Sequence, residues 1–166
     1  MIINLVTDTH LRGAVFEDGA RILLRRELEN NFIFCVKKFD SLIEIVDKYR
    51  LNYQSIKEEF SFFRVNPCLC DLVEFVLDNT SSRNIIKINF YDVKTRYFNS
   101  KRKYFDACIS NHEFMKKMQS SGFGVFIASI ILFDKWNFSF NIHNYESVFL
   151  KIHDSTTKKI VDYQRK

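Results

Sequence analysis

Apolar residues along this chain recur with two different spacings, which separate expected strands from expected helices. In the amino-terminal part, residues 2–7 form an apolar run, and short apolar segments at residues 14–17 and 21–25 flank Asp18-Gly19, a pair typical of tight turns. We therefore expect a buried strand followed by a β-hairpin. A further strand is expected at residues 32–36.

The middle of the chain has the spacing of amphipathic helices. After Ser41, which can cap a helix, apolar residues recur three or four positions apart as far as Tyr49, and this spacing predicts a helix of about three turns. A second helix is expected at residues 55–63. A third is expected at residues 68–77, opened by Pro67 and closed by a polar run.

From residue 84 onward, apolar residues again alternate with polar ones. The alternation predicts a strand at residues 86–91, and then two strands at residues 96–98 and 102–107 that flank a turn at Asn99-Ser100. These last two strands would form a basic hairpin. The remaining expected elements are a helix at residues 112–118 and strands at residues 123–132, 137–142 and 148–152, followed by a polar tail.

This order of elements predicts an α+β fold, with a mainly antiparallel mixed sheet and about three or four helices. The 166 residues suffice for one hydrophobic core and are too few for two ordinary domains, so residues 1–166 are expected to form a single domain. The longest apolar stretch, residues 123–133, is too short to cross a bilayer, and the amino terminus lacks the cationic start of a signal peptide. We expect a cytoplasmic protein with no membrane partner.

The charge distribution singles out residues 83–103. This segment has seven cationic residues and one anionic residue, a local charge of +6 against +5 for the whole chain. Aromatic residues lie between the cations, and cations that neutralise phosphates beside rings on which bases stack are typical of nucleic-acid surfaces. The candidate binding residues are Arg83, Lys87, Tyr91, Lys94, Arg96, Tyr97, Lys101, Arg102, Lys103 and Tyr104.

Two other interpretations of this basic segment stay open. Half-buried strands show the same alternation, because long cationic side chains keep an exposed sheet edge from aggregating. The cations also suit an acidic protein surface. If the partner is nucleic acid, Tyr91, Tyr97 and Tyr104 are expected to supply stacking or orientation.

Four cysteines are present, at positions 35, 68, 70 and 108. Zinc sites usually take cysteines in pairs separated by two residues, and only Cys68-Leu69-Cys70 approaches that spacing. Reduced and mostly buried thiols are therefore the favoured interpretation.

The opening of the chain resembles the first motif of the calcineurin-like metallophosphoesterases. Asp8-Thr9-His10 follows an apolar run, and Asn111-His112-Glu113 resembles the family's Asn-His motif, with His143 and His153 as late histidines. The resemblance implies two metal ions that activate water on a phosphate ester. The family's metal-bridging Gly-Asp motif has no match, however, and a two-metal site does not assemble without it. We expect no enzyme activity, no cofactor and no bound metal, with a metal-dependent phosphoesterase as the alternative.

Residues 5–13 (LVTDTHLRG) and 20–26 (ARILLRR), together with size and composition, resemble the early host-takeover proteins of T-even-type phages, a group that includes Alc-like transcription terminators. Phe, Ile, Lys and Asn are frequent and Ala, Gly and Pro are rare, a bias that AT-rich coding produces. The resemblance implies a viral protein that inhibits or redirects host transcription by contacting host RNA polymerase, DNA or both, in the host cytoplasm.

Overall fold

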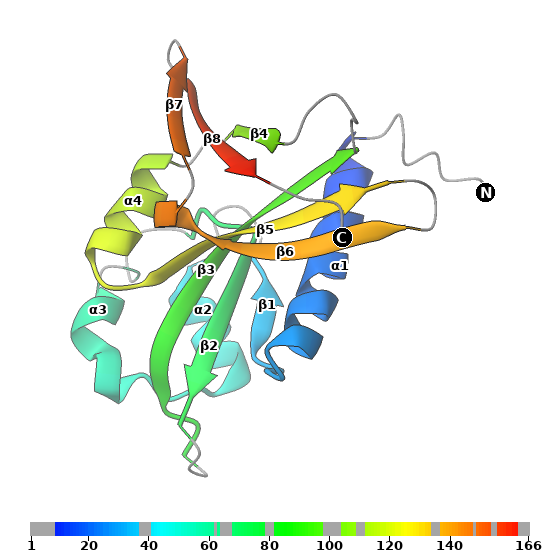
Figure 1. The fold of residues 1–166 in the computed structure, drawn as a ribbon. Coiled ribbons are helices and arrows are strands. Elements are labelled where there is room, and N and C mark those ends of the chain that lie inside the picture. Colours follow the sequence, from blue (N-terminus) through cyan, green and yellow to red (C-terminus); the bar gives the residue numbers. More distant parts are fainter. Residues whose placement is uncertain are drawn as a thin grey trace.

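A mixed five-stranded β-sheet with helices on both faces forms the centre of the molecule (Figure 1). The computed structural model describes residues 9–36, 41–61, 63, 68–78, 82–97, 104–108, 112–133, 137–147, 149–153 and 156–162. The strands of this sheet, in spatial order, are β1 (Ile33–Cys35), β2 (Leu72–Leu77), β3 (Ile85–Tyr97), β5 (Gly124–Leu132) and β6 (Phe138–Asn144). Only the β3–β5 pair of this sheet is parallel. The predicted α+β class with a mainly antiparallel mixed sheet is confirmed.

Helices cover the two faces of the sheet unequally. One face carries α1 (Thr9–Glu27), whose Ala20 and Leu24 are buried against β1, β2, β3 and β5. The other face carries α2, α3 and α4 and holds the larger core cluster. These helices span Leu42–Tyr49, Lys57–Ser61 and His112–Ser120, and short 3₁₀ turns lie at Gln54–Ile56 and Tyr145–Ser147.

A second, three-stranded antiparallel sheet is formed by β4 (Tyr104–Cys108), β8 (Thr156–Asp162) and β7 (Phe149–His153), with β8 in the middle. It lies at the end of the molecule opposite the β2–β3 connection (Figure 1). None of the described helices is long and apolar enough to span a membrane.

Most elements from the middle of the chain onward were predicted correctly. The structure confirms a strand near residues 32–36, the helix after Ser41, helical structure at residues 55–61 and the helix from His112. It also confirms that the strands at residues 124–132 and 138–144 pair with each other, and that residues 149–153 form a strand.

The expected amino-terminal hairpin is wrong, because both of its strands lie within α1. Asp18-Gly19 sits inside this helix and forms no turn. The helix exposes Val15 (44%) and Ile22 (55%) on its outer side while it buries Leu24, so its apolar residues lack a clear helical period. The strand expected at residues 2–7 lies outside the described residues.

The helix expected at residues 68–77 is also wrong, since Leu72–Leu77 form β2. This segment, LVEFVL, is buried on both faces at Leu72, Val73 and Phe75, as a central strand between two covered faces should be. A short, continuously apolar run does not distinguish a buried strand from a buried helix. Pro67, which was expected to open the helix, lies outside the described residues.

The expected basic hairpin is wrong as well. β3 continues without a break from Ile85 to Tyr97 and pairs with β2 and β5, while β4 pairs with β8 in the second sheet. The turn expected at Asn99-Ser100 lies outside the described residues. Part of the expected polar tail forms β8, which pairs with the preceding strand β7 and with β4, a strand distant in sequence.

Candidate partner-binding groove

A cavity of about 450 Å³ lies where α1, β1 and α2 meet. Because α1 and α2 lie on opposite faces of the sheet and β1 is its edge strand, the cavity opens beside that edge. We call this cavity the edge groove. It is lined by Asp18, Arg21 and Arg25 of α1, Phe34 and Cys35 of β1, and Glu44, Ile45, Lys48 and Tyr49 of α2.

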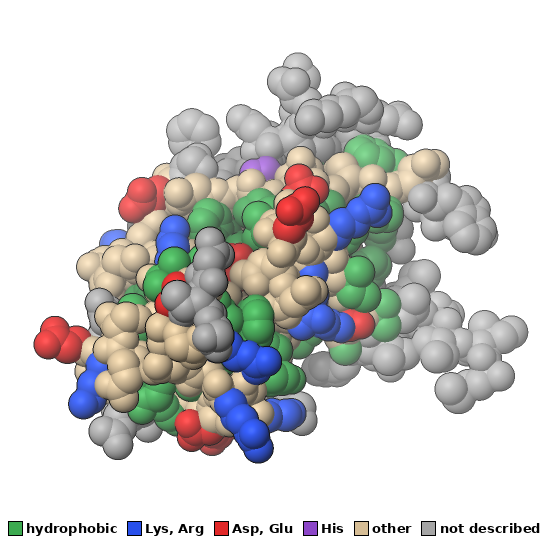
Figure 2. All heavy atoms as spheres, turned by 90° about the horizontal axis from the view of Figure 1, so that it is seen from below, with side chains coloured by type: hydrophobic (Ala, Val, Ile, Leu, Met, Phe, Trp, Pro, Cys, Tyr) green, Lys and Arg blue, Asp and Glu red, His purple; other side chains and the backbone are tan. Residues whose placement is uncertain are grey.

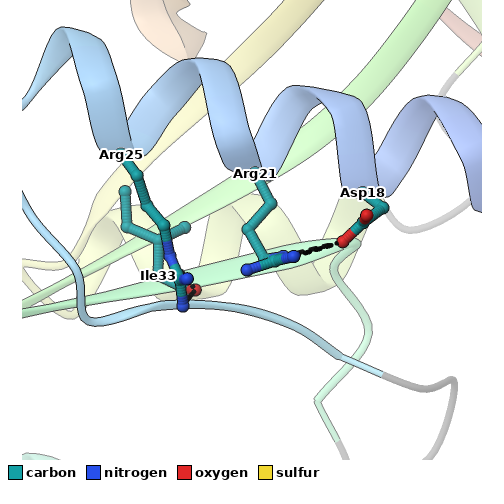
Figure 3. Close-up of polar contacts among 4 residues, drawn as sticks. All are labelled: Asp18, Arg21, Arg25 and Ile33. Atoms are coloured by element: carbon teal, nitrogen blue, oxygen red, sulfur yellow. Dashed lines mark hydrogen bonds and ion pairs between the residues drawn. The ribbon is translucent and has the colours of Figure 1, made fainter.

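Three charged residues on one side of α1 form the first wall of the edge groove. Asp18, Arg21 and Arg25 are separated by three and four positions, so they lie along one side of the helix and point toward β1 (Figure 3). The Arg21 guanidinium donates to Asp18 Oδ1, with an Nε–Oδ1 distance of 2.9 Å. This bond is the main reason why the pKa of Arg21 lies above its ordinary value.

Arg25 binds the edge strand directly. Its Nη2 and Nε donate to the carbonyl oxygen of Ile33 at 2.7 and 3.1 Å (Figure 3). Its guanidinium also lies 5.9 Å from the centre of the Phe34 ring. Burial and the nearby charge of Arg21 hold the pKa of Arg25 below its ordinary value. The cation is therefore incompletely compensated by its surroundings, and a bound anion would stabilise it.

α2 supplies the second wall, and its position is fixed by a capping box. The Ser41 hydroxyl accepts from the backbone N–H of Glu44, and the Glu44 carboxylate accepts from the backbone N–H of Ser41. Leu42, Ile45 and Val46 are buried against the sheet. The Glu44 carboxylate is consequently held at the helix amino terminus, where the helix dipole favours negative charge.

Aromatic rings form the apolar part of the edge groove. The Phe34 and Tyr49 rings lie 4.2 Å apart between their centres, and Phe34 also contacts Phe75 in the core at 5.9 Å. Lys48 Nζ lies 5.7 Å from the centre of the Tyr49 ring. None of the described carboxylates forms an ion pair with Lys48.

Cys35 lies in the edge groove as an unbridged cysteine, and is the exposed one among the three cysteines whose side chains are described. Partial burial raises the pKa of its thiol, although Arg21 opposes this shift, so the group is neutral near pH 7. Cys68 and Cys70 do follow the expectation, being buried and reduced, with their sulfur atoms 3.1 Å apart. The side chain of Cys108 is outside the described set.

The structure disperses the described members of the predicted basic segment. Arg83 is exposed just before β3 and Lys87 is exposed near its start, whereas Arg96 is exposed near its end, about 30 Å from Lys87 at the rise of an extended strand. Lys94 is half-buried and paired with Asp92 at 2.7 Å. On the face in Figure 2, cationic side chains are interspersed with acidic, apolar and other side chains and form no single stripe.

Of the remaining predicted residues, one is buried and the others are described only in part or not at all. Only the backbone of Tyr97 and Tyr104 is described, at the end of β3 and the start of β4, and these strands belong to different sheets. Lys101, Arg102 and Lys103 lie outside the described residues. Tyr91 is 2% exposed and its ring is stacked on Phe126, 5.2 Å between centres, so it cannot stack on a base in this conformation.

Tyr91 belongs instead to a buried polar network centred on Glu74. Glu74 is 4% exposed and accepts hydrogen bonds from Tyr91 Oη at 2.6 Å, Asn89 Nδ2 at 2.7 Å and Asn30 Nδ2 at 3.0 Å. Burial, and next the bond to Glu74, raise the pKa of the Tyr91 hydroxyl. The network joins β2 and β3 to the loop after α1, and has a structural role.

A second buried carboxyl group, Asp92, lies on the opposite face of β3. Its Oδ1 accepts from Lys94 Nζ, and its buried Oδ2 has no hydrogen-bond partner among the described residues. Burial raises the pKa of Asp92 to about 7. Lys94 opposes this shift and neighbouring Asp71 adds to it.

The described residues of the metallophosphoesterase resemblance lie on different elements of the fold. Asp8 and Asn111 lie outside the described residues, His10 is in the first turn of α1, and His112 and Glu113 begin α4. His143 in β6 forms a 3.0 Å hydrogen bond with Ser129, and the backbone of His153 ends β7. No group of three or more His, Cys, Asp or Glu residues is placed to hold a metal among the described side chains.

Comparison of this chain with protein family models, curated proteins and solved structures finds no match.

Sequence reasoning missed the edge groove because it placed Asp18, Arg21 and Arg25 in a hairpin. On a helix, their spacing of three and four positions is the signal of a charged face. That signal becomes visible only after residues 9–27 are assigned to a helix.

Proposed function

We propose that this protein is a non-enzymatic binding protein whose edge groove holds an acidic segment of a partner protein. The observation that carries the proposal is the position of Arg21, Arg25 and Lys48 around the Phe34–Tyr49 ring pair. The two acidic lining residues are engaged, Asp18 by Arg21 and Glu44 by the α2 cap. With three cations against these two carboxylates, the lining of the groove carries a net charge of +1 next to an apolar surface.

The phage resemblance supplies the biological role that we propose for this binding. An early host-takeover protein that contacts host RNA polymerase would inhibit or redirect transcription without catalysing a reaction. Acidic segments of such an assembly are the chemistry that the edge groove would recognise, with electrostatics guiding encounter and the aromatic rings supplying contact area.

Nucleic acid is the less favoured partner for this groove. A phosphate backbone presents continuous negative charge, which Asp18 and Glu44 would repel, whereas a peptide can place isolated carboxylates beside the three cations. The basic segment around Lys101, Arg102 and Lys103 remains the proposed contact for DNA, if DNA is bound. Binding of a labelled oligonucleotide, measured beside that of an acidic peptide, distinguishes the two partner classes.

The first prediction concerns charge reversal in the edge groove. Fluorescence anisotropy with a labelled acidic peptide of Glu and Val, about nine residues long, should show that Lys48→Glu weakens binding by about tenfold, because a ligand carboxylate loses its partner and meets a like charge. Lys57→Glu on α3 changes the net charge equally at an exposed position outside the groove, and should leave affinity within about twofold.

Equal losses in the two variants would show a nonspecific charge effect and overturn the proposal. A labelled oligothymidylate of the same length tests the other partner class. If it binds more tightly than the peptide, and if its binding depends on Lys101, Arg102 and Lys103 rather than on Lys48, the protein acts on nucleic acid and the acidic-peptide proposal is wrong.

A further inference from the structure

The edge groove has the geometry of a vacant strand position. β1 is the outermost strand of the sheet as described, and β2 is its only strand neighbour among the described residues. The groove lies on its other side, between helices on opposite faces of the sheet. A peptide lying there in extended form would become a neighbour of β1 in the plane of the sheet, as in recognition by β-strand addition. This inference rests on the proposed function, because it specifies how the acidic segment is held.

Backbone directions support this geometry. Phe32 O accepts from Phe75 N and Val36 N donates to Asp71 O, so residues 32, 34 and 36 direct their peptide groups toward β2. Ile33 and Cys35 consequently direct theirs outward. The bond from Arg25 to Ile33 O confirms the outward direction at Ile33.

Arg25 takes the place of a strand neighbour at this edge. Its two N–H groups donate to the Ile33 carbonyl, where the N–H of an added strand would donate. Such capping protects a short edge strand from uncontrolled pairing. When a peptide N–H replaces the guanidinium, Arg25 is free to turn toward a carboxylate of the same peptide.

The two walls differ in chemistry, and this difference predicts a sequence pattern. The α1 wall presents Arg21 and Arg25 together with Asp18. The α2 wall presents Ile45 and Tyr49 beside Phe34, together with Glu44 and Lys48, and Lys48 is the cation left to meet a carboxylate on that side. Successive side chains of a strand point to opposite faces. An added strand with acidic residues toward α1 therefore places the residues between them against the apolar wall.

We propose that the edge groove binds an extended peptide as an additional strand beside β1, and that the peptide alternates acidic and apolar residues. The acidic residues contact Arg21 and Arg25, the apolar residues contact Phe34, Ile45 and Tyr49, and the peptide backbone hydrogen-bonds to Ile33 and Cys35.

The test compares two peptides of identical composition, one alternating Glu and Val and the other with all Glu residues before all Val residues. The alternating peptide should bind about tenfold more tightly in fluorescence anisotropy, because only its order satisfies both walls. If both peptides bind equally and both respond to Lys48→Glu, the acidic-segment function stands and strand addition is wrong. If neither binds, the proposed function fails as well.

Backbone N-methylation tests the hydrogen bonds directly on the unaltered protein. Only alternate peptide N–H groups of an added strand face β1. Methylating that set should weaken binding at least about tenfold, and methylating the other set should weaken it much less. Equal affinity for the two methylated peptides would overturn strand addition.

A protein variant complements the peptides. Cys35→Pro removes only an outward N–H, since proline is tolerated on an edge strand where its nitrogen faces away from the sheet. Cys35→Pro should lower the affinity for the alternating peptide to the affinity for the peptide in which all Glu residues precede all Val residues. Cys35→Val keeps the N–H and should keep the affinity for the alternating peptide. If analytical ultracentrifugation shows instead that the protein dimerises through this edge, and Cys35→Pro abolishes the dimer, the occupant is a second copy and the peptide proposal is overturned.

Discussion

Asp92 is a buried residue whose ionisation should affect the stability of the fold. In the unfolded chain its pKa is near the ordinary value of 3.8, and in the folded protein it is about 7. Between these pH values the folded state holds a proton that the unfolded chain has lost, so this contribution to stability is fully present below pH about 4 and is lost as the pH rises through about 7. The cause is burial of the carboxyl group, enhanced by Asp71 and opposed by Lys94.

We therefore predict that Asp92→Asn flattens the fall in the free energy of unfolding between pH 5 and pH 8, measured by urea denaturation. Asp47→Asn, at an exposed position of α2, is the matched control and should leave the wild-type slope unchanged. A wild-type slope in the Asp92 variant would contradict the assignment of this pH dependence to Asp92. Glu17, whose pKa burial also raises, would be the next residue to test.

Gly124, at the start of β5, has no room for a Cβ atom. A Cβ at this position would overlap the Asn89 side-chain amide of β3, with the Phe126 ring also close. We predict that Gly124→Ala lowers the free energy of unfolding by about 1–3 kcal/mol, as overpacking of a core does. The double variant Gly124→Ala with Asn89→Ala should lose less stability than the two single variants lose together, because removing the amide makes room for the methyl group. Strict additivity in thermal denaturation would count against this contact.

At the scale of elements, the carboxyl end of α2 carries backbone strain. Arg50 ends this helix in the left-handed region with φ of 54°, and its N–H donates to the carbonyls of Asp47 and Val46. Glycine is the usual residue at this position because it has no Cβ to strain the backbone. Arg50→Gly should therefore raise the free energy of unfolding by about 0.5–1 kcal/mol.

The same substitution inside a helix gives the matched control. Arg26→Gly, at an exposed position in the last turn of α1, should lower the free energy of unfolding by about 0.5–1 kcal/mol, because glycine has a low helix propensity and the variant loses a cation that the helix dipole favours at this end. Opposite signs in chemical denaturation are the expected result. A loss of stability in both variants would show that Arg50 makes a stabilising contact that outweighs the strain.

Elements were predictable where local signals and burial agree. α2 combines a capping residue, Ser41, with three buried apolar residues at helical spacing, and was found from sequence. α1 was not, because it exposes Val15 and Ile22 and contains Asp18-Gly19, which suggests a turn elsewhere. β2 was missed because a short apolar run fits a buried strand and a buried helix equally well.

At the scale of the whole molecule, long-range pairing could not be predicted. The sequence indicates strands near residues 96 and 104 but not that they join different sheets, since the partners of β3 and β4 are β5 and β8. The edge groove also depends on contacts between segments that are distant in sequence, because it forms where α1, α2 and the edge strand β1 meet. Arg21 and Lys48 are brought together by tertiary structure alone.

The parallel pairing of β3 with β5 also bears on how the protein is made. A nascent chain that has emerged from the ribosome as far as Tyr97 can already join β1, β2 and β3, but the edge of β3 at Asn89–Tyr97 awaits β5, which follows a connection of residues 98–123. An open edge flanked by apolar faces favours association with other chains. The middle of translation is thus the stage at which this protein most needs chaperone protection.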